Sequence, residues 1–164
     1  MPLDKMTGEQ AKLRFKVLDS KPAKPYSRPA DFDTTAKELP ELTTSTITAQ
    51  VATNNDTTPK MYGSPKAGTG LTWAEPAPGE ASWSGSMSGL VQPTEQERAA
   101  MLELQNALGR YVWLEQSLDG ETKPDGGLVI ITSRGRPVPV DGNVTFDIGF
   151  TGVGPNFLDT TAIV

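Results

Sequence analysis

The stretch from Ala81 to Gly109 constrains the fold most, because its pattern is that of a β-strand leading directly into a helix. Serine occupies every second position from Ser82 to Ser88, and the other side of the segment holds Trp83, Gly85, Met87, Gly89 and Val91. This period of two predicts a strand with one buried and one solvated face.

A helix is predicted after this strand. Thr94 and Glu97 have the spacing of a capping box, in which a hydroxyl and a carboxylate satisfy backbone N–H groups of the first turn. The apolar residues that follow recur at intervals of three and four: Ala100, Met101, Leu104, Ala107 and Leu108. Gly109 can adopt the left-handed conformation that ends a helix. We expect the apolar stripe to close over a β-sheet core.

Five more segments are predicted as strands. Residues 11–18, 42–53 and 143–151 alternate, and residues 111–117 and 128–133 form two further strands joined by a polar turn. In residues 143–151, one face carries Val144, Phe146, Ile148 and Phe150, and the other carries Thr145, Asp147, Gly149 and Thr151. The predicted fold class is therefore mainly β: a β-sandwich or partial barrel with one flanking α-helix and long extended loops.

The first of these segments has a basic face. Lys12, Arg14 and Lys16 alternate with apolar residues. We predict a half-buried strand with a solvated cationic rim. The alternative is that the three charges pair with acidic residues of a neighbouring copy.

Two long connections have no usable period. Residues 20–41 contain Pro22, Pro25, Pro29 and Pro40 and predict an extended, proline-rich arm, which we assign to assembly because long structureless connections usually serve binding. Residues 54–80 predict a long excursion between two strands, either a protruding hairpin or a flexible loop. We expect one domain over residues 1–156 and a short C-terminal tail over residues 157–164.

The composition excludes several classes of site. The chain has no cysteine and no histidine, which removes disulfides, thiolate nucleophiles, Cys/His zinc sites and any Ser-His-Asp triad. Residues 63–69 lack the lysine of a phosphate loop, and the acidic residues of 119–125 lack the spacing of an EF-hand. Asp141 and Asp147 have no evident partner for acid–base catalysis. We therefore predict no enzyme and assign no catalytic, cofactor-binding or metal-binding residue.

The charge is unevenly distributed. Residues 1–60 carry nine Lys/Arg and eight Asp/Glu, whereas residues 61–164 carry six and twelve. A surface that grips nucleic acid must be basic, so we expect no ordinary nucleic-acid binding. Residues 1–10 lack the apolar core of a signal peptide, and residues 128–131, the longest aliphatic run, are too few to span a membrane. We expect a soluble product of the cytoplasm without a membrane partner.

The order of strand, capped helix, strand, hairpin and valine-rich strand resembles that of the tail tube, or major tail, proteins of long non-contractile-tailed bacteriophages, the lambda-like group. Four segments carry the resemblance: Ser82 to Leu90, Thr94 to Gly109, Tyr111 to Glu115, and Val144-Thr-Phe-Asp-Ile-Gly-Phe-Thr-Gly-Val-Gly-Pro155. The resemblance implies a structural virion protein whose β-sandwich, flanked by a helix, assembles six to a ring. The rings would stack into a tube through which DNA is ejected.

The resemblance also implies partners and a location. The partners would be further copies of the chain and the tape measure, tail terminator and distal tail proteins, with double-stranded DNA passing through without specific binding and with no cofactor. The location would be the virion tail, after assembly in the host cytoplasm. We expect the arm, the 54–80 loop and the termini to stack the rings.

The residues fit such a tube on physical grounds. A ring of β-subunits needs open sheet edges that a neighbour completes. A duplex must slide through the bore, so the lining must be neutral or acidic. We expect some of the following residues to face the lumen: Thr46, Thr48, Ser84, Ser86, Thr145 and Asp147.

Two alternatives stay open. One is the tube protein of a contractile tail or secretion system, which would be surrounded by a sheath. The other, of a different class, is a monomeric carbohydrate-binding β-sandwich that uses Trp73, Trp83 and Trp113 as stacking platforms. Trp83 and Trp113 lie on the predicted core pattern, which counts against the second alternative.

Overall fold

The computed structural model describes residues 11–55, 76–118 and 124–156. These residues form seven strands and two helices: β1 (Ala11–Val17), α1 (Phe32–Thr35), β2 (Lys37–Glu38), β3 (Leu42–Asn55), β4 (Pro76–Leu90), α2 (Glu95–Asn106), β5 (Tyr111–Leu118), β6 (Asp125–Gly135) and β7 (Thr145–Gly152). The prediction of a mainly-β fold is confirmed.

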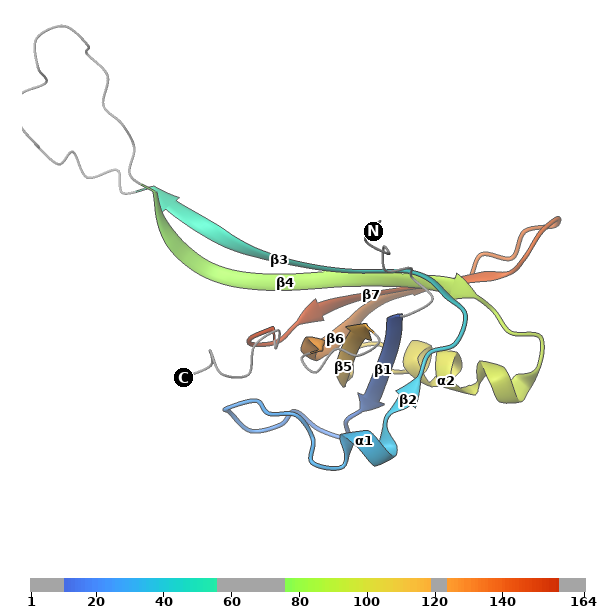
Figure 1. Ribbon diagram of the computed structural model, residues 1–164. Helices are drawn as coiled ribbons and strands as arrows, with labels where there is room; N and C mark the ends of the chain where they lie inside the picture. The colour runs from blue at the N-terminus through green and yellow to red at the C-terminus, as the bar shows by residue number, and fades with distance from the viewer. Residues whose placement is uncertain (1–10, 56–75, 119–123, 157–164) are drawn as a thin grey trace, which may run out of the picture.

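The strands belong to one antiparallel sheet with the order β2-β1-β5-β6-β7-β4-β3. This sheet is strongly bent, so that β3 and β4 cross over β1, β5 and β6 (Figure 1). Its two halves therefore face each other like the layers of a sandwich. One hydrogen bond joins the two halves directly: Ser45 Oγ of β3 donates to Gln116 Oε1 of β5 at 2.5 Å.

The hydrophobic core lies between these two halves. Its largest fully buried side chains come from five strands and α2: Leu13, Phe15, Met87, Leu104, Leu114, Ile131, Phe146, Ile148 and Phe150. Each strand contributes alternate residues, as a period of two requires. One apolar face of a single sheet is thus buried against itself.

Helix α2 begins at the predicted cap. The Glu97 amide donates to Thr94 Oγ1 at 3.3 Å, and the Thr94 hydroxyl donates to the Glu97 carboxylate at 2.6 Å. Met101 is buried in the core as predicted, whereas Leu108 lies beyond the end of α2 and is exposed. Gly109 has a φ of 75°, the left-handed conformation expected where the chain leaves the helix.

The long connection between β3 and β4 is in part strand. The two strands extend the hairpin to Asn55 and Pro76, and Figure 1 shows it protruding from the body of the molecule. Pairing of β4 with β7 begins only at Ser84. Pro76 and Pro78 lie in the part of β4 before this point, so on that side their missing N–H groups break no hydrogen bond of the sheet. A protruding hairpin is therefore confirmed for these ends, while residues 56–75 lie outside the described residues.

The prediction of an extended arm over residues 20–41 was wrong. This segment contains α1 and β2, and it packs on the outer side of the sheet. Phe32, which is 0% exposed, and Tyr26 form a second small core with Trp113 and Leu128. Strand β5 is consequently covered on both faces. Isolated aromatic residues between prolines give no periodic signal, so the sequence did not predict this packing.

Ion pairs hold the same segment in place. Glu115 of β5 is only 4% exposed and accepts hydrogen bonds from Arg28 Nε at 2.5 Å and from Trp113 Nε1 at 3.0 Å. Arg28 also donates to Asp33, at 2.7 and 2.9 Å. A buried carboxylate requires such compensation, because an unpaired charge is costly in apolar surroundings.

The basic face of β1 joins these ion pairs. Lys16 pairs with Asp31 at 2.6 Å, and Arg14 lies 3.4 Å from Asp33 and 3.5 Å from Glu115. Arg14 and Lys16 remain partly exposed, at 33% and 23%, and each has an acidic partner in the same chain that the sequence did not indicate. A contact of this rim with a neighbouring copy stays a prediction.

The ion pairs predict a pH-dependent stability. Hydrogen bonding from Arg28 lowers the pKa of Asp33 from 3.8 to about 2, so the charged carboxylate favours the folded state. This stabilisation is complete above about pH 4 and is lost as the pH falls towards 2. We expect Asp33→Asn to unfold at a lower urea concentration than the wild type at pH 7, and the difference to shrink between pH 4 and pH 2.

The matched control is Asp141→Asn, which changes an exposed acid outside the described ion pairs. It should leave the urea midpoint unchanged at neutral pH. A difference between Asp33→Asn and the wild type that stayed constant down to pH 2 would contradict the assignment.

Candidate functional site

The candidate site is the outer face of β3, β4 and β7, the side that points away from the core. Its register places Thr46 opposite Ser86 and Thr48 opposite Ser84. On the other side of β4, Ser88 lies opposite Asp147. We call this surface the hydroxyl face; it comprises Thr44, Thr46, Thr48, Ser84, Ser86, Ser88, Thr145, Asp147 and Thr151.

The structure brings all six predicted site residues to this one face. Thr46, Thr48, Ser84, Ser86 and Asp147 are exposed, and Thr145 is half-buried. Analysis of the sequence did not select the other members, Thr44, Ser88 and Thr151, although the same alternation places them here. Which of these residues would line a lumen stays a prediction.

The orientation of the hydroxyl face is fixed by the residues between its members. Met87 on β4 and Ile148 on β7 each point into the core and are 1% exposed. Because side chains alternate, a slip of one residue would expose both of them and bury the hydroxyls. Two glycines complete the fit: a Cβ on Gly85 would lie 2.5 Å from the Phe150 ring, and one on Gly89 would lie 2.7 Å from Phe146.

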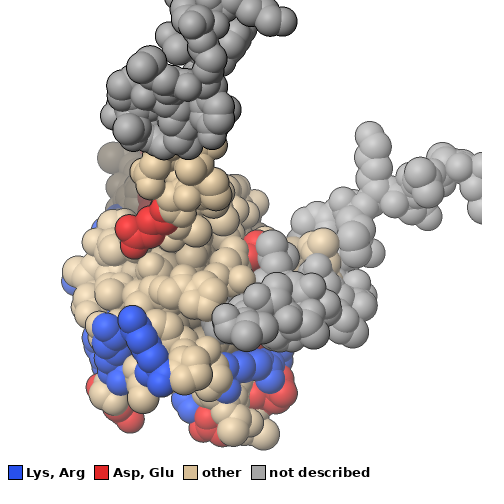
Figure 2. Space-filling view, turned by 90° about the vertical axis from the view of Figure 1, so that its left-hand side faces the viewer, with Lys and Arg blue, Asp and Glu red and all other residues tan. Residues whose placement is uncertain are grey.

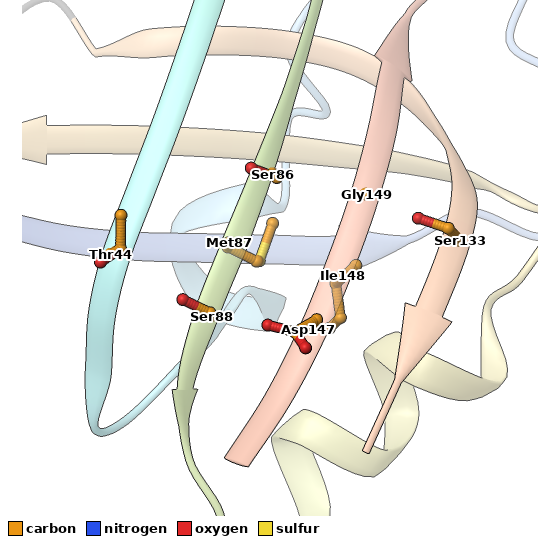
Figure 3. A pocket seen from close by; sticks show the side chains of 8 residues that line it. All are labelled: Thr44, Ser86, Met87, Ser88, Ser133, Asp147, Ile148 and Gly149. Atoms are coloured by element: carbon orange, nitrogen blue, oxygen red, sulfur yellow. The ribbon is translucent and has the colours of Figure 1, made fainter. Parts of the chain in front are cut away.

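A hollow of about 190 Å³ lies on the hydroxyl face. Figure 3 shows its polar side chains coming from four strands, with Thr44 from β3, Ser86 and Ser88 from β4, Asp147 from β7 and Ser133 from β6. Hydroxyl groups both donate and accept hydrogen bonds, so such a surface is readily hydrated. Asp147 provides the only charge of the hydroxyl face, and that charge is negative.

Two absences hold for the described residues: a group of metal-binding side chains and a helix that could cross a membrane. Within residues 11–55, 76–118 and 124–156, no three His, Cys, Asp or Glu side chains are grouped so that they could bind a metal ion. In the same ranges no helix has the length and apolar character needed to cross a membrane. The predicted acidic turn of 119–125 lies largely outside the described residues.

Trp83 and Trp113 are buried. Trp83 is 4% exposed and donates from Nε1 to the Gly154 carbonyl at 2.9 Å, and Trp113 is 2% exposed. A sugar-stacking platform requires an accessible aromatic face, which neither ring offers. Trp73 lies outside the described residues. This burial counts further against a carbohydrate-binding protein.

The two faces of β4 predict opposite mutational effects. Ser86→Val changes an exposed side chain and is expected to alter the free energy of unfolding by less than about 0.5 kcal/mol. Met87→Ala removes a fully buried side chain and is expected to cost about 2–5 kcal/mol. Urea unfolding of the two variants tests this directly. A larger loss from Ser86→Val than from Met87→Ala would mean that β4 has the opposite register.

Comparison of this fold with known proteins gives structural matches only. No protein-family model and no curated protein matches the chain. Chains of two gene transfer agent (GTA) particles match with a TM-score of 0.56 over 93% of this chain. The first chain, from the tail of an empty particle with C6 symmetry, has 14% sequence identity to this protein, and the alignment covers 97% of it. The second, from the native virion, has 13% sequence identity, and the alignment covers 98% of it.

The SPP1 tail tube gives a further match. Its TM-score is 0.62, with 17% identity, and the alignment covers 93% of this chain and 78% of the SPP1 chain. At such identities the matches establish a common fold. The chain therefore shares its fold with a tail tube subunit, and the predicted fold class is confirmed.

Proposed function

We propose that the protein is a structural subunit of a tail tube in the virion of a bacteriophage of the lambda-like group, forming stacked hexameric rings that conduct DNA. In this proposal residues 1–156 form one tail-tube domain and residues 157–164 a tail. One observation carries the proposal: a nearly uncharged hydroxyl face lies beside an open sheet edge. The shared fold with the SPP1 tail tube supports it.

The open edge is that of β3. This 14-residue strand is the last in the sheet and pairs, among the described strands, only with β4. The opposite edge is β2, which has only two residues. A long unpaired edge is an aggregation hazard unless another chain completes it. Pairing of β3 with a neighbouring copy would continue the sheet around a ring.

The hydroxyl face would then line the bore. A ring closed through β3 with this face inward presents hydroxyl groups and one Asp147 per subunit to the passing duplex. Such a lining neither attracts phosphates strongly nor exposes apolar groups to water. The C6 symmetry of the GTA tail supports six copies per ring.

The remaining roles follow from this assignment. The tube would meet the tape measure, tail terminator and distal tail proteins, would assemble in the host cytoplasm, and would need no cofactor or catalytic residue. DNA would pass without specific binding.

Proline substitutions on β3 test the edge. Consecutive N–H groups point to opposite edges of a strand, so of Gln50 and Val51 one directs its N–H towards β4 and the other towards the open edge. We expect one of Gln50→Pro and Val51→Pro to destabilise the fold. The other should remain a folded monomer that forms no tubes in negative-stain electron microscopy.

The pair contains its own control, because both prolines have the same intrinsic effect on the chain. Tubes formed by the variant that stays folded would exclude pairing at the β3 edge. A wild-type protein that stays monomeric at every concentration would refute the tail-tube function itself.

Charge reversal on the hydroxyl face tests the bore. Asp147→Lys would place a ring of cations against the duplex, and we expect slower DNA ejection from particles with tubes of normal length. Asp147→Asn is the control and should eject at close to the normal rate. The measurement is the time course of DNA release, with tube length checked by microscopy. Normal release from Asp147→Lys particles would place this residue outside the bore.

A further inference from the structure

The loop between β6 and β7 exposes two valines. Val138 is 70% exposed and Val140 is 102% exposed, more than any other large hydrophobic side chain of the described residues. They alternate with Pro137 and Pro139, whose rings fix the backbone. Apolar surface of this kind typically marks an interaction site.

The base of this loop is held in place. The Thr145 amide donates to the Pro137 carbonyl at 3.4 Å, and Arg136 Nη2 donates to Gln105 Oε1 of α2 at 3.1 Å. The loop turns back at Gly142, which has a φ of 112°. Because Pro137 and Pro139 restrict its backbone, the loop loses less conformational entropy on binding than a chain without prolines would. We call residues 137–142 the valine–proline loop.

A groove lies at the other end of the molecule. It has a volume of about 630 Å³ and is lined by Lys21, Lys24, Tyr26, Trp83 and residues 152–156, among others. In Figure 1 the chain after β7 and the blue segment before α1 lie at the left, whereas the valine–proline loop projects at the right. The volume falls within the range of about 300–1,000 Å³ that is typical of binding pockets.

The wall of the groove is preformed. A Cβ on Gly152 would lie 2.0 Å from the Trp83 indole, and one on Gly154 would lie 2.6 Å from the Tyr26 ring. Gly154 also has a φ of 79°, and its carbonyl accepts the hydrogen bond from Trp83 Nε1. The Gly-Val-Gly turn that ends β7 therefore packs two aromatic rings into the lining. Both rings are almost fully buried, Trp83 at 4% exposed and Tyr26 at 9%, so they support the wall of the groove from behind.

Groove and loop carry opposite net charges. Lys21, Lys24 and Glu80 line the groove and are exposed, so its cations outnumber its one anion. Figure 2, which looks onto this side of the molecule, shows basic side chains on its lower part, acidic side chains beside and below them, and a further acidic patch higher up. The only charged residue of the valine–proline loop is Asp141, which is also exposed.

We propose that the valine–proline loop of one copy docks into the groove of a second copy in the next ring. Val138 and Val140 contact the lining beside Trp83, and Asp141 lies near Lys21 and Lys24. The proposal rests on the tail-tube function. Pairing through β3 extends the sheet in its hydrogen-bonding direction, within a ring. Loop and groove lie at opposite ends of the strands, so their contact would join one ring to the next. A head-to-tail contact that does not close on itself produces a filament.

Engineered cysteines test this contact. The chain has no cysteine, so the pair Lys21→Cys and Val140→Cys in one chain reports only the intended approach. After mild oxidation, tubes of this variant should give a ladder of disulfide-linked multimers on a non-reducing gel, and each single variant should run as a monomer. The matched control combines Val140→Cys with Thr34→Cys, an exposed position on α1 outside the groove, and should give no ladder.

A second variant separates this contact from ring formation. Val138→Asp combined with Val140→Asp alters exposed side chains only, so the urea midpoint should not change. Rings should still form, while the protein concentration needed for tubes should rise about tenfold or more, since the apolar contacts of both valines are lost and each new carboxylate must be desolvated on docking.

The outcomes are distinguishable. Wild-type tubes without a ladder from the Lys21→Cys and Val140→Cys pair, or normal tubes from the double aspartate variant, would overturn the docking and leave the tail-tube function standing. A ladder from the Thr34→Cys control that equals that of the groove pair would also overturn it. A wild-type protein without rings or tubes would refute the function on which the docking rests.

Discussion

Burial of one apolar face of a bent sheet against itself is the interaction on which this structure depends. β4 and β7 supply Met87, Ile148 and Phe150 from one half, and β1 and β5 supply Leu13 and Leu114 from the other. The contact is hydrophobic, and the free energy it contributes is proportional to the apolar area removed from water. Since the strands alternate, burying this face commits the opposite face of β3, β4 and β7 to solvent. The hydroxyl face is thus a direct consequence of the core.

The same contact explains why one long edge has no partner among the described strands. Closing the two halves over each other leaves β3 at the end of the strand order, beyond β4 and away from β1. A monomer gains nothing from a 14-residue edge strand, whereas an assembly can use it for pairing. The fold therefore separates a core that stabilises the single chain from surfaces available to further copies.

Much of this arrangement was predictable from alternation. The serines of β4 and the aromatic residues of β7 indicated which face is buried, and Thr94 marked the start of α2. Residues 20–41 were not predictable, because Tyr26 and Phe32 are isolated and meet Trp113 only in three dimensions. Glu115 looked like an ordinary polar residue of a strand, although a distant arginine covers it. The groove joins four separate segments, and no local pattern could indicate it.

The burial of Glu115 has a consequence for how copies exchange segments. Its carboxylate is nearly inaccessible and depends on Arg28, which comes from the segment that also carries Lys21, Lys24 and Tyr26. If this segment detached to swap into a neighbouring chain, it would leave a charge stranded in an apolar setting. Opening of this segment is therefore costly and its exchange between chains is slow, while a completed reciprocal swap would restore the same ion pair.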